Sequence, residues 1–169
     1  MALYFIANGP MPTTASQAAV TTGTSIKTML QVKASATNII KIKEWGISFD
    51  GSAAATPIKC ELLETDVAAT VTASAAADLI KFDGNALSNG DPTTNLIPVG
   101  TTSTGYTSTS EGTITAVRMF DVQFIAPTNQ YVKQFPLGLE PIIQVSKFGR
   151  IRVLAGAAVN CYCYMIVEV

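Results

Sequence analysis

Apolar side chains alternate with polar ones along several stretches of this sequence, and this period of two limits the possible fold more than any other feature. Residues 26–33 show the pattern clearly, with Leu30 and Val32 on one side and lysines on the other. They predict a strand with one buried face. Residues 58–62 repeat the pattern directly after Pro57, so we expect a second strand of the same kind there.

A change of parity interrupts the alternation within residues 40–49. The even positions are apolar up to Ile42, whereas the odd positions are apolar from Trp45 to Phe49. A slip of one residue turns every later side chain to the opposite face of a strand. We therefore expect a bulge near Glu44 and Trp45, and burial of Trp45 in the core.

The rest of the chain combines further strands with long stretches rich in Ala, Thr and Ser. In residues 113–125 the even positions are apolar except for Arg118, so this face is expected to be buried. Residues 73–82 are expected to carry at most a helical turn or two. Further strands are expected at 131–133, 142–147, 150–154 and 159–169.

These strands predict an all-β fold, an antiparallel β-sandwich in the form of an eight-stranded jelly roll. One domain is expected over 1–169, because no linker separates two cores and this length suits a single core. Residues 1–24 are expected to form an N-terminal arm. Residues 83–112 are expected to form a long Thr/Ala/Ser-rich loop, either on the surface or ordered against a neighbouring subunit.

Composition excludes several classes of function. Charged residues make up only 14% of the chain, against about 25% in an average protein. A formal net charge of −1 argues against nucleic acid as a partner, because phosphate binding needs clustered Lys and Arg.

The chain has no histidine, which excludes the Ser-His-Asp and Cys-His nucleophiles. Glu61 and Glu64 have opposite parity on a strand, so they do not form a catalytic pair. We expect no enzyme activity and no cofactor.

Three cysteines, Cys60, Cys161 and Cys163, give no disulfide framework. Burial as small apolar side chains is favoured over a zinc site, for which no fourth ligand is evident, and over a bridge to Cys60. No apolar run is long enough to span a membrane, and the N-terminal residues lack the pattern of a signal peptide. We expect no membrane partner, and synthesis in a cytoplasm without a signal peptide.

Two arginines of one predicted strand, Arg150 and Arg152, share a face. Charged side chains of this kind often protect a solvated strand edge from pairing, and that is the expected role. A salt bridge between subunits is the alternative.

The last predicted strand is apolar or aromatic on both of its faces. Cys161, Cys163 and Met165 begin one face, while Tyr162, Tyr164 and Ile166 form the other. An antiparallel strand with one wet face should instead alternate apolar and polar residues. Either this is a central strand beneath a loop, or its second face is a subunit interface, where tyrosine is enriched. We expect Tyr162, Tyr164 and Ile166 to mediate self-association.

The N-terminal residues Leu3, Tyr4, Phe5 and Ile6 are the candidates for contact with a different partner. They precede Pro10 and Pro12 in the expected arm. An extended apolar segment of this kind can add as a strand to the sheet of another protein.

Several phrases of the sequence together resemble a recurrent group of small proteins encoded among the structural genes of tailed bacteriophages. They are the opening Met-Ala-Leu-Tyr, residues 24–28 and 45–51, residues 55–65, residues 140–143 and the tyrosine-rich final strand. In this respect the chain is similar to phage virion proteins of jelly-roll type, and in particular to capsid decoration (cement) proteins.

The resemblance implies a structural role without catalytic residues. A decoration protein would form a homotrimer, bind the major capsid protein and lie on the outer capsid surface of the virion. The alternative is a fibre or receptor-binding domain of the tail or baseplate, with carbohydrate as a conceivable ligand. A sugar site would need an exposed aromatic residue, whereas Trp45 is expected to be in the core.

Overall fold

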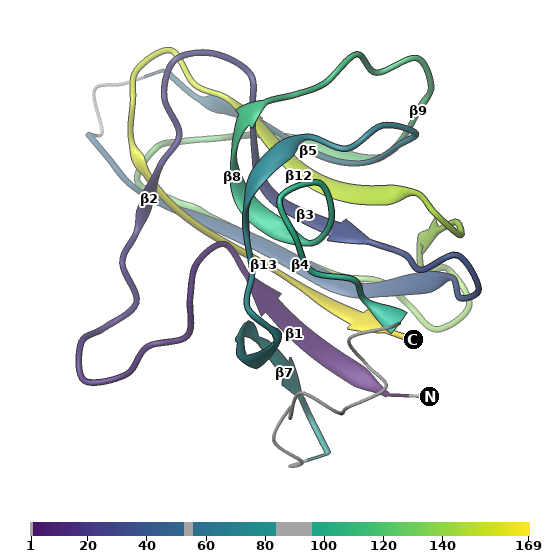
Figure 1. Ribbon diagram of the computed structural model, residues 1–169. Coiled ribbons are helices and arrows are strands. Elements are labelled where there is room, and N and C mark those ends of the chain that lie inside the picture. Colours follow the sequence, from purple (N-terminus) through teal and green to yellow (C-terminus); the bar gives the residue numbers. More distant parts are fainter. Residues whose placement is uncertain (1, 53–55, 84–95) are drawn as a thin grey trace.

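The computed structural model describes residues 2–52, 56–83 and 96–169, and these residues form two antiparallel β-sheets that face each other (Figure 1). The expected all-β fold and antiparallel sandwich are confirmed. The described residues form sheets of seven and six strands, more strands than the eight expected of a jelly roll.

The seven-stranded sheet has the order β10-β4-β13-β1-β7, with β11 also pairing with β4 and β2 with β13. Strand β13, the last of the sequence, lies at its centre between β4 and β1. The strands of this sheet are β1 (Leu3–Ala7), β2 (Val20–Thr21), β4 (Ile40–Asp50), β7 (Leu79–Lys81), β10 (Gln130–Gln134), β11 (Ile142–Ile143) and β13 (Asn160–Glu168).

The six-stranded sheet has the order β6-β8-β3-β12-β5-β9, so that β6 and β9 are its edges. One 3-10 turn, Ala76–Asp78, precedes β7 and confirms the short helical turn expected in that region. The strands of this sheet are β3 (Lys27–Lys33), β5 (Ile58–Thr65), β6 (Thr70–Ala73), β8 (Gly105–Ser110), β9 (Val117–Ile125) and β12 (Phe148–Leu154).

The bulge predicted in β4 is present, one residue before the expected position. Ile166 of β13 pairs with Glu44 and Val167 pairs with Ile42, so Lys43 is the extra residue. Because of this bulge Ile42 and Trp45 are both buried between the sheets. The change of parity in the sequence therefore locates a real change of register.

The core lies between the inner faces of the two sheets. Trp45 is 0% exposed, as expected. Three free thiols, Cys60, Cys161 and Cys163, are buried in this core, which confirms the favoured interpretation of the cysteines. Burial raises the pKa of the Cys60 and Cys163 thiols, which keeps them in the neutral form.

Strand β3 is buried on both faces, although the alternation predicted one wet face. Residues 28–32 are all buried. Ile151 pairs with Leu30 and Arg152 with Thr28, so a bulge at Met29 turns Met29 into the core. The outer side chain of Gln31 bonds to the loops that cover it, since its Oε1 accepts from Ala69 N at 2.8 Å.

The long loop expected at 83–112 is only partly a loop. Residues 84–95 lie outside the described residues. Residues 105–110 form β8, which pairs with both β3 and β6. The prediction of an unstructured stretch there is wrong, because Thr- and Ser-rich sequence without apolar alternation can still fill a strand whose neighbours supply the pairing.

Arg150 and Arg152 do not protect a strand edge, because β12 lies inside the sheet between β3 and β5. Arg150 is 0% exposed and donates to the carbonyl oxygens of Val67 and Glu111 from covering loops. Burial lowers its pKa to about 10, and the nearby carboxylate of Glu111 opposes this shift. Arg152 bonds to Glu61 within the same chain, at 2.7 Å.

Candidate interaction surface

The outer side of the seven-stranded sheet carries an aromatic and apolar surface that we call the aromatic face. It is centred on β13 and extends across the neighbouring strands in register. The side chains that define it are Phe5, Val132, Tyr162, Tyr164 and Ile166.

Tyr164 lies at the middle of the aromatic face, and a glycine makes room for it. Tyr164 pairs with Gly46 of β4, and a Cβ atom placed on Gly46 would be 2.7 Å from Cζ of the tyrosine ring. No side chain other than hydrogen therefore fits beneath this ring. On the far side of Gly46 lies the exposed Val132 of β10.

The Tyr164 hydroxyl is fixed by Glu44, one of the few charged groups beside the aromatic face. It donates to Glu44 Oε1 at 2.6 Å. Burial raises the pKa of this tyrosine, and the hydrogen bond to the carboxylate adds to the shift. The hydroxyl therefore remains a neutral donor, and the Glu44 carboxylate has a partner within the sheet.

Phe5 and Tyr162 continue the aromatic array on either side of Tyr164. The Phe5 ring stacks on Tyr164 with centroids 5.2 Å apart, and Tyr162 lies 6.5 Å from the same ring. Phe5 pairs in register with Ile166 on one side and with the exposed Ile80 of β7 on the other. Apolar contacts therefore run without a charged residue from β7 through β1 to β13.

A hollow of about 550 Å³ adjoins one end of the aromatic face. Leu3, Phe82 and Ile166 are its apolar lining residues. Lys43, the bulged residue of β4, also lines it and forms ion pairs with Glu140 and Glu168. The hydrogen bonds that Lys43 donates to these two carboxylates raise its pKa, so it stays charged and its charge is balanced inside the chain.

The three residues expected to mediate self-association do lie together. Tyr162, Tyr164 and Ile166 share the outer face of β13, and each is half-buried. The structure also shows that β13 is a central strand, because β4 and β1 pair with its two edges.

The four N-terminal candidates are divided between two environments. Tyr4 and Ile6 point into the core, while Leu3 is exposed and Phe5 is half-buried on the outer side. Both edges of β1 are paired, one with β13 and one with β7, so this strand cannot add to the sheet of another protein. The expected arm at 1–24 is wrong for residues 3–7, which form β1; within that range the loop between β1 and β2 projects from the sheets (Figure 1).

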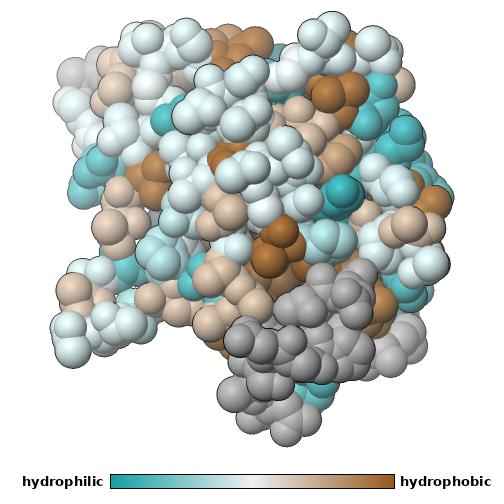
Figure 2. All heavy atoms as spheres, viewed as in Figure 1, coloured by the Kyte–Doolittle hydropathy of each residue, from teal (hydrophilic) through white to brown (hydrophobic). Residues whose placement is uncertain are grey.

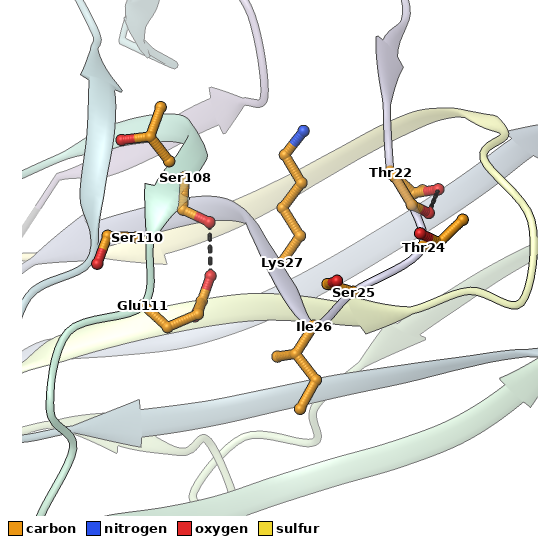
Figure 3. Close-up of a pocket in the computed structure, with 10 residues that line it drawn as sticks. Thr22, Thr24, Ser25, Ile26, Lys27, Ser108, Ser110 and Glu111 are labelled. Carbon is orange, nitrogen blue, oxygen red and sulfur yellow. Dashed lines mark hydrogen bonds between the residues drawn. The ribbon is translucent and has the colours of Figure 1, made fainter.

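A second hollow, lined mainly by hydroxyl groups, lies between residues 22–27 and 108–111 (Figure 3). Its volume is about 330 Å³. The carboxylate of Glu111 on its wall already accepts from Ser108 Oγ at 2.5 Å and from Thr28 N at 2.6 Å. The acid is therefore part of the fold, and the hollow offers only neutral hydrogen-bonding groups together with Lys27.

Among the described residues there is no group of three or more His, Cys, Asp or Glu side chains that could hold a metal ion. The same part of the chain contains no helix long and apolar enough to cross a membrane. The buried position of Trp45 removes it as a stacking platform for a sugar. The view in Figure 2 shows a surface dominated by residues of intermediate hydropathy, with strongly hydrophilic residues in scattered positions.

The sequence alone identifies the β13 residues of the aromatic face but misses Val132 and the role of Gly46. Their positions follow from the pairing of β10 with β4, which no local pattern encodes. Comparisons of the chain with protein-family models, with curated proteins and with solved structures found no match.

Proposed function

We propose that this protein is a non-enzymatic structural component of a tailed-phage virion, a decoration protein that assembles as a homotrimer through the aromatic face. The observation that carries the proposal is the continuous array of Phe5, Tyr164 and Tyr162 on the outside of a sheet whose inner face is already packed. Aromatic side chains gathered on an exposed sheet are typical of surfaces that are buried on association.

The charged groups around the aromatic face are arranged so that this face can be buried against a second molecule. Glu44 is bonded to Tyr164, and Lys43 is ion-paired with Glu140 and Glu168. No isolated charge among these would have to lose its hydration when a second surface approaches. The small share of charged residues in the whole chain agrees with a protein that is surrounded by neighbours.

In this proposal the trimer binds the major capsid protein on the outside of the head. Leu3 is the N-terminal candidate that remains available for that contact, since Tyr4 and Ile6 are buried and Phe5 belongs to the aromatic face. Attachment through several copies at once raises the total avidity far above that of a single site.

Oligomeric mass tests the self-association. Substitution of Tyr162→Asp together with Val132→Asp places two carboxylates on the aromatic face, and we expect the molar mass measured by light scattering to fall threefold. Both side chains are at least partly exposed, so near-UV circular dichroism should remain native. The matched control is Leu137→Asp, because Leu137 is 92% exposed in a loop and lies outside the aromatic face. An unchanged mass of the double variant contradicts the proposal.

Location tests the virion role. Protein carrying a gold label is added to phage particles that lack it, and electron microscopy records where the label binds. Label on the head is expected. Label confined to the tail or baseplate would favour the alternative of a fibre or receptor-binding domain, and absence of label from the particles would contradict a virion role.

A further inference from the structure

Strand β9, at the edge of the six-stranded sheet, carries an exposed apolar stripe on a different sheet from the aromatic face. The four members of the stripe are 36% to 72% exposed, and Phe124 is the most exposed of them. They are Val117, Met119, Val122 and Phe124. The sequence predicts a buried apolar face for this segment, and that prediction is wrong, because Val122 and Phe124 pair with the charged outer residues of β5 and point away from the core.

A bulge explains why the stripe contains both odd and even positions. Leu62 of β5 pairs with Asp121 and Leu63 pairs with Met119, so Phe120 is the extra residue of β9. The bulge keeps Phe120 and Asp121 both on the inner side, where Phe120 packs against the core. As a result, all four members of the stripe project from the same outer side of the strand.

The outer side of this strand edge carries no charge. Among the described residues, no strand pairs with the second edge of β9. Edge strands are commonly protected by charges, proline or bulges, and β9 has no proline and no charge within its stripe. Its bulge and its two charged residues are used within the chain, where Arg118 is paired with Glu64 at 2.8 Å and Asp121 is bonded to Tyr131 at 3.0 Å. An open edge of this kind accepts a β-strand.

We infer that β9 pairs antiparallel with β9 of a second copy about a two-fold axis, which joins the two six-stranded sheets edge to edge. One register places outer residues opposite outer residues: Val117 faces Phe124 of the other copy, and Met119 faces Val122. The same register sets Arg118 opposite Gln123 on the inner side. Apolar groups therefore meet apolar groups, and no like charges face each other.

The available area is consistent with this contact. The four side chains expose roughly 400 Å² of apolar surface, which is within the range of the largest patches on monomers, and these are often functional. A standard interface buries about 800 Å² per partner. The backbone edge of the strand, on the order of 30 Å long, and the outer side chain of Lys59 on the adjoining strand β5 add to this area.

This second interface uses a different sheet from the aromatic face, so the two can be separated. If both exist, a trimer built through the aromatic face would pair into a larger assembly through β9. Loss of the β9 contact changes the mass twofold, whereas loss of the aromatic contact changes it threefold.

Cross-linking between two different cysteine variants tests the register. Met119→Cys and Val122→Cys are mixed in equal amounts and oxidised. We expect far more disulfide-linked dimer in the mixture than in either variant alone, because the register brings residue 119 of one copy beside residue 122 of the other. The native cysteines are buried and do not compete. A mixture of Leu137→Cys with Val122→Cys is the control, and no excess over that control would overturn the inference.

The second test places a charge on the edge of β9 and measures the molar mass by light scattering. Val122→Lys should halve the molar mass, both in the otherwise unchanged protein and in the Tyr162→Asp, Val132→Asp variant. A mass that is unaffected by Val122→Lys in both backgrounds, at concentrations up to the millimolar range, would overturn β9 pairing and leave the aromatic interface standing. A twofold fall without any effect of the aromatic substitutions would support β9 pairing and reject the proposed trimer contact.

Discussion

The indole N–H of Trp45 donates a hydrogen bond of 3.2 Å to Oδ2 of Asp121, across the space between the two sheets. Trp45 belongs to β4 of one sheet and Asp121 to β9 of the other. The same carboxylate accepts from the Tyr131 hydroxyl at 3.0 Å and from Gln123 Nε2 at 3.0 Å. One buried acid therefore satisfies the polar groups of an otherwise apolar core and connects its two layers.

Asp121 should make the stability of the protein sensitive to acid. Burial favours a raised pKa for this carboxyl, but the hydrogen bonds from Gln123 and Tyr131 and the charge of Lys133 together hold its pKa below the ordinary value. A carboxyl with a lowered pKa stabilises the folded state above its unfolded pKa of about 3.9 and loses that contribution as the pH falls through the lower folded value.

Substitution of Asp121→Asn should therefore cost about 1–3 kcal/mol of unfolding free energy at neutral pH and flatten its fall below about pH 4. Urea unfolding followed by Trp45 fluorescence at a series of pH values measures both effects. Asp50→Asn, at the exposed end of β4, is the control and should leave the curve close to wild type. An acid dependence that is unchanged in Asp121→Asn would show that other carboxyls dominate it.

Gly46→Ala should disturb the aromatic face without any change in its charge. The new methyl group would overlap the Tyr164 ring, which must move and loosen its stacking on Phe5. We expect a loss of about 1–3 kcal/mol in unfolding free energy, and the near-UV dichroism of the tyrosines should decrease. Ser48→Ala, two residues along β4, is the matched control and should have a small effect. Equal stability of both variants would contradict the packing described for Tyr164.

Arg150 and Arg152 provide a comparison of a buried and a partly exposed arginine on one strand. Arg150→Ala removes the partner of the Glu111 carboxylate and of two buried carbonyl groups, and should cost about 3–5 kcal/mol. Arg152→Ala breaks only the partly exposed pair with Glu61 and should cost about 1 kcal/mol or less. Denaturant unfolding of the two variants measures the difference, and a cost for Arg152→Ala as large as that for Arg150→Ala would contradict this ranking.

Alternation in the sequence predicts a strand well where one face meets the core and the other meets water. It locates β5 and the parity change that becomes the bulge at Lys43, because both patterns are local. Alternation does not reveal that the outer face of a strand is covered by distant loops. This is the case for β3, where Gln31 is bonded to Ala69.

The candidate site is predictable only in part for a related reason. Tyr162, Tyr164 and Ile166 share a face by parity alone. The contact of Phe5 with the β13 residues depends on pairing between strands more than 150 residues apart along the chain. Strand β9 shows that an apolar face can point outward. The hydrophobicity of the sequence shows which face of a strand is apolar throughout. Whether that face points into the core or outward depends on the register between distant strands.

The central place of β13 also has a consequence for the order of folding. Since β1 and β4 meet only across this strand, the seven-stranded sheet cannot close until β13 has joined them. The pairing of β1 with β13 joins residues more than 150 positions apart in the sequence. Contacts this distant form slowly because a long loop must close first, so we expect this sheet to be completed late in folding.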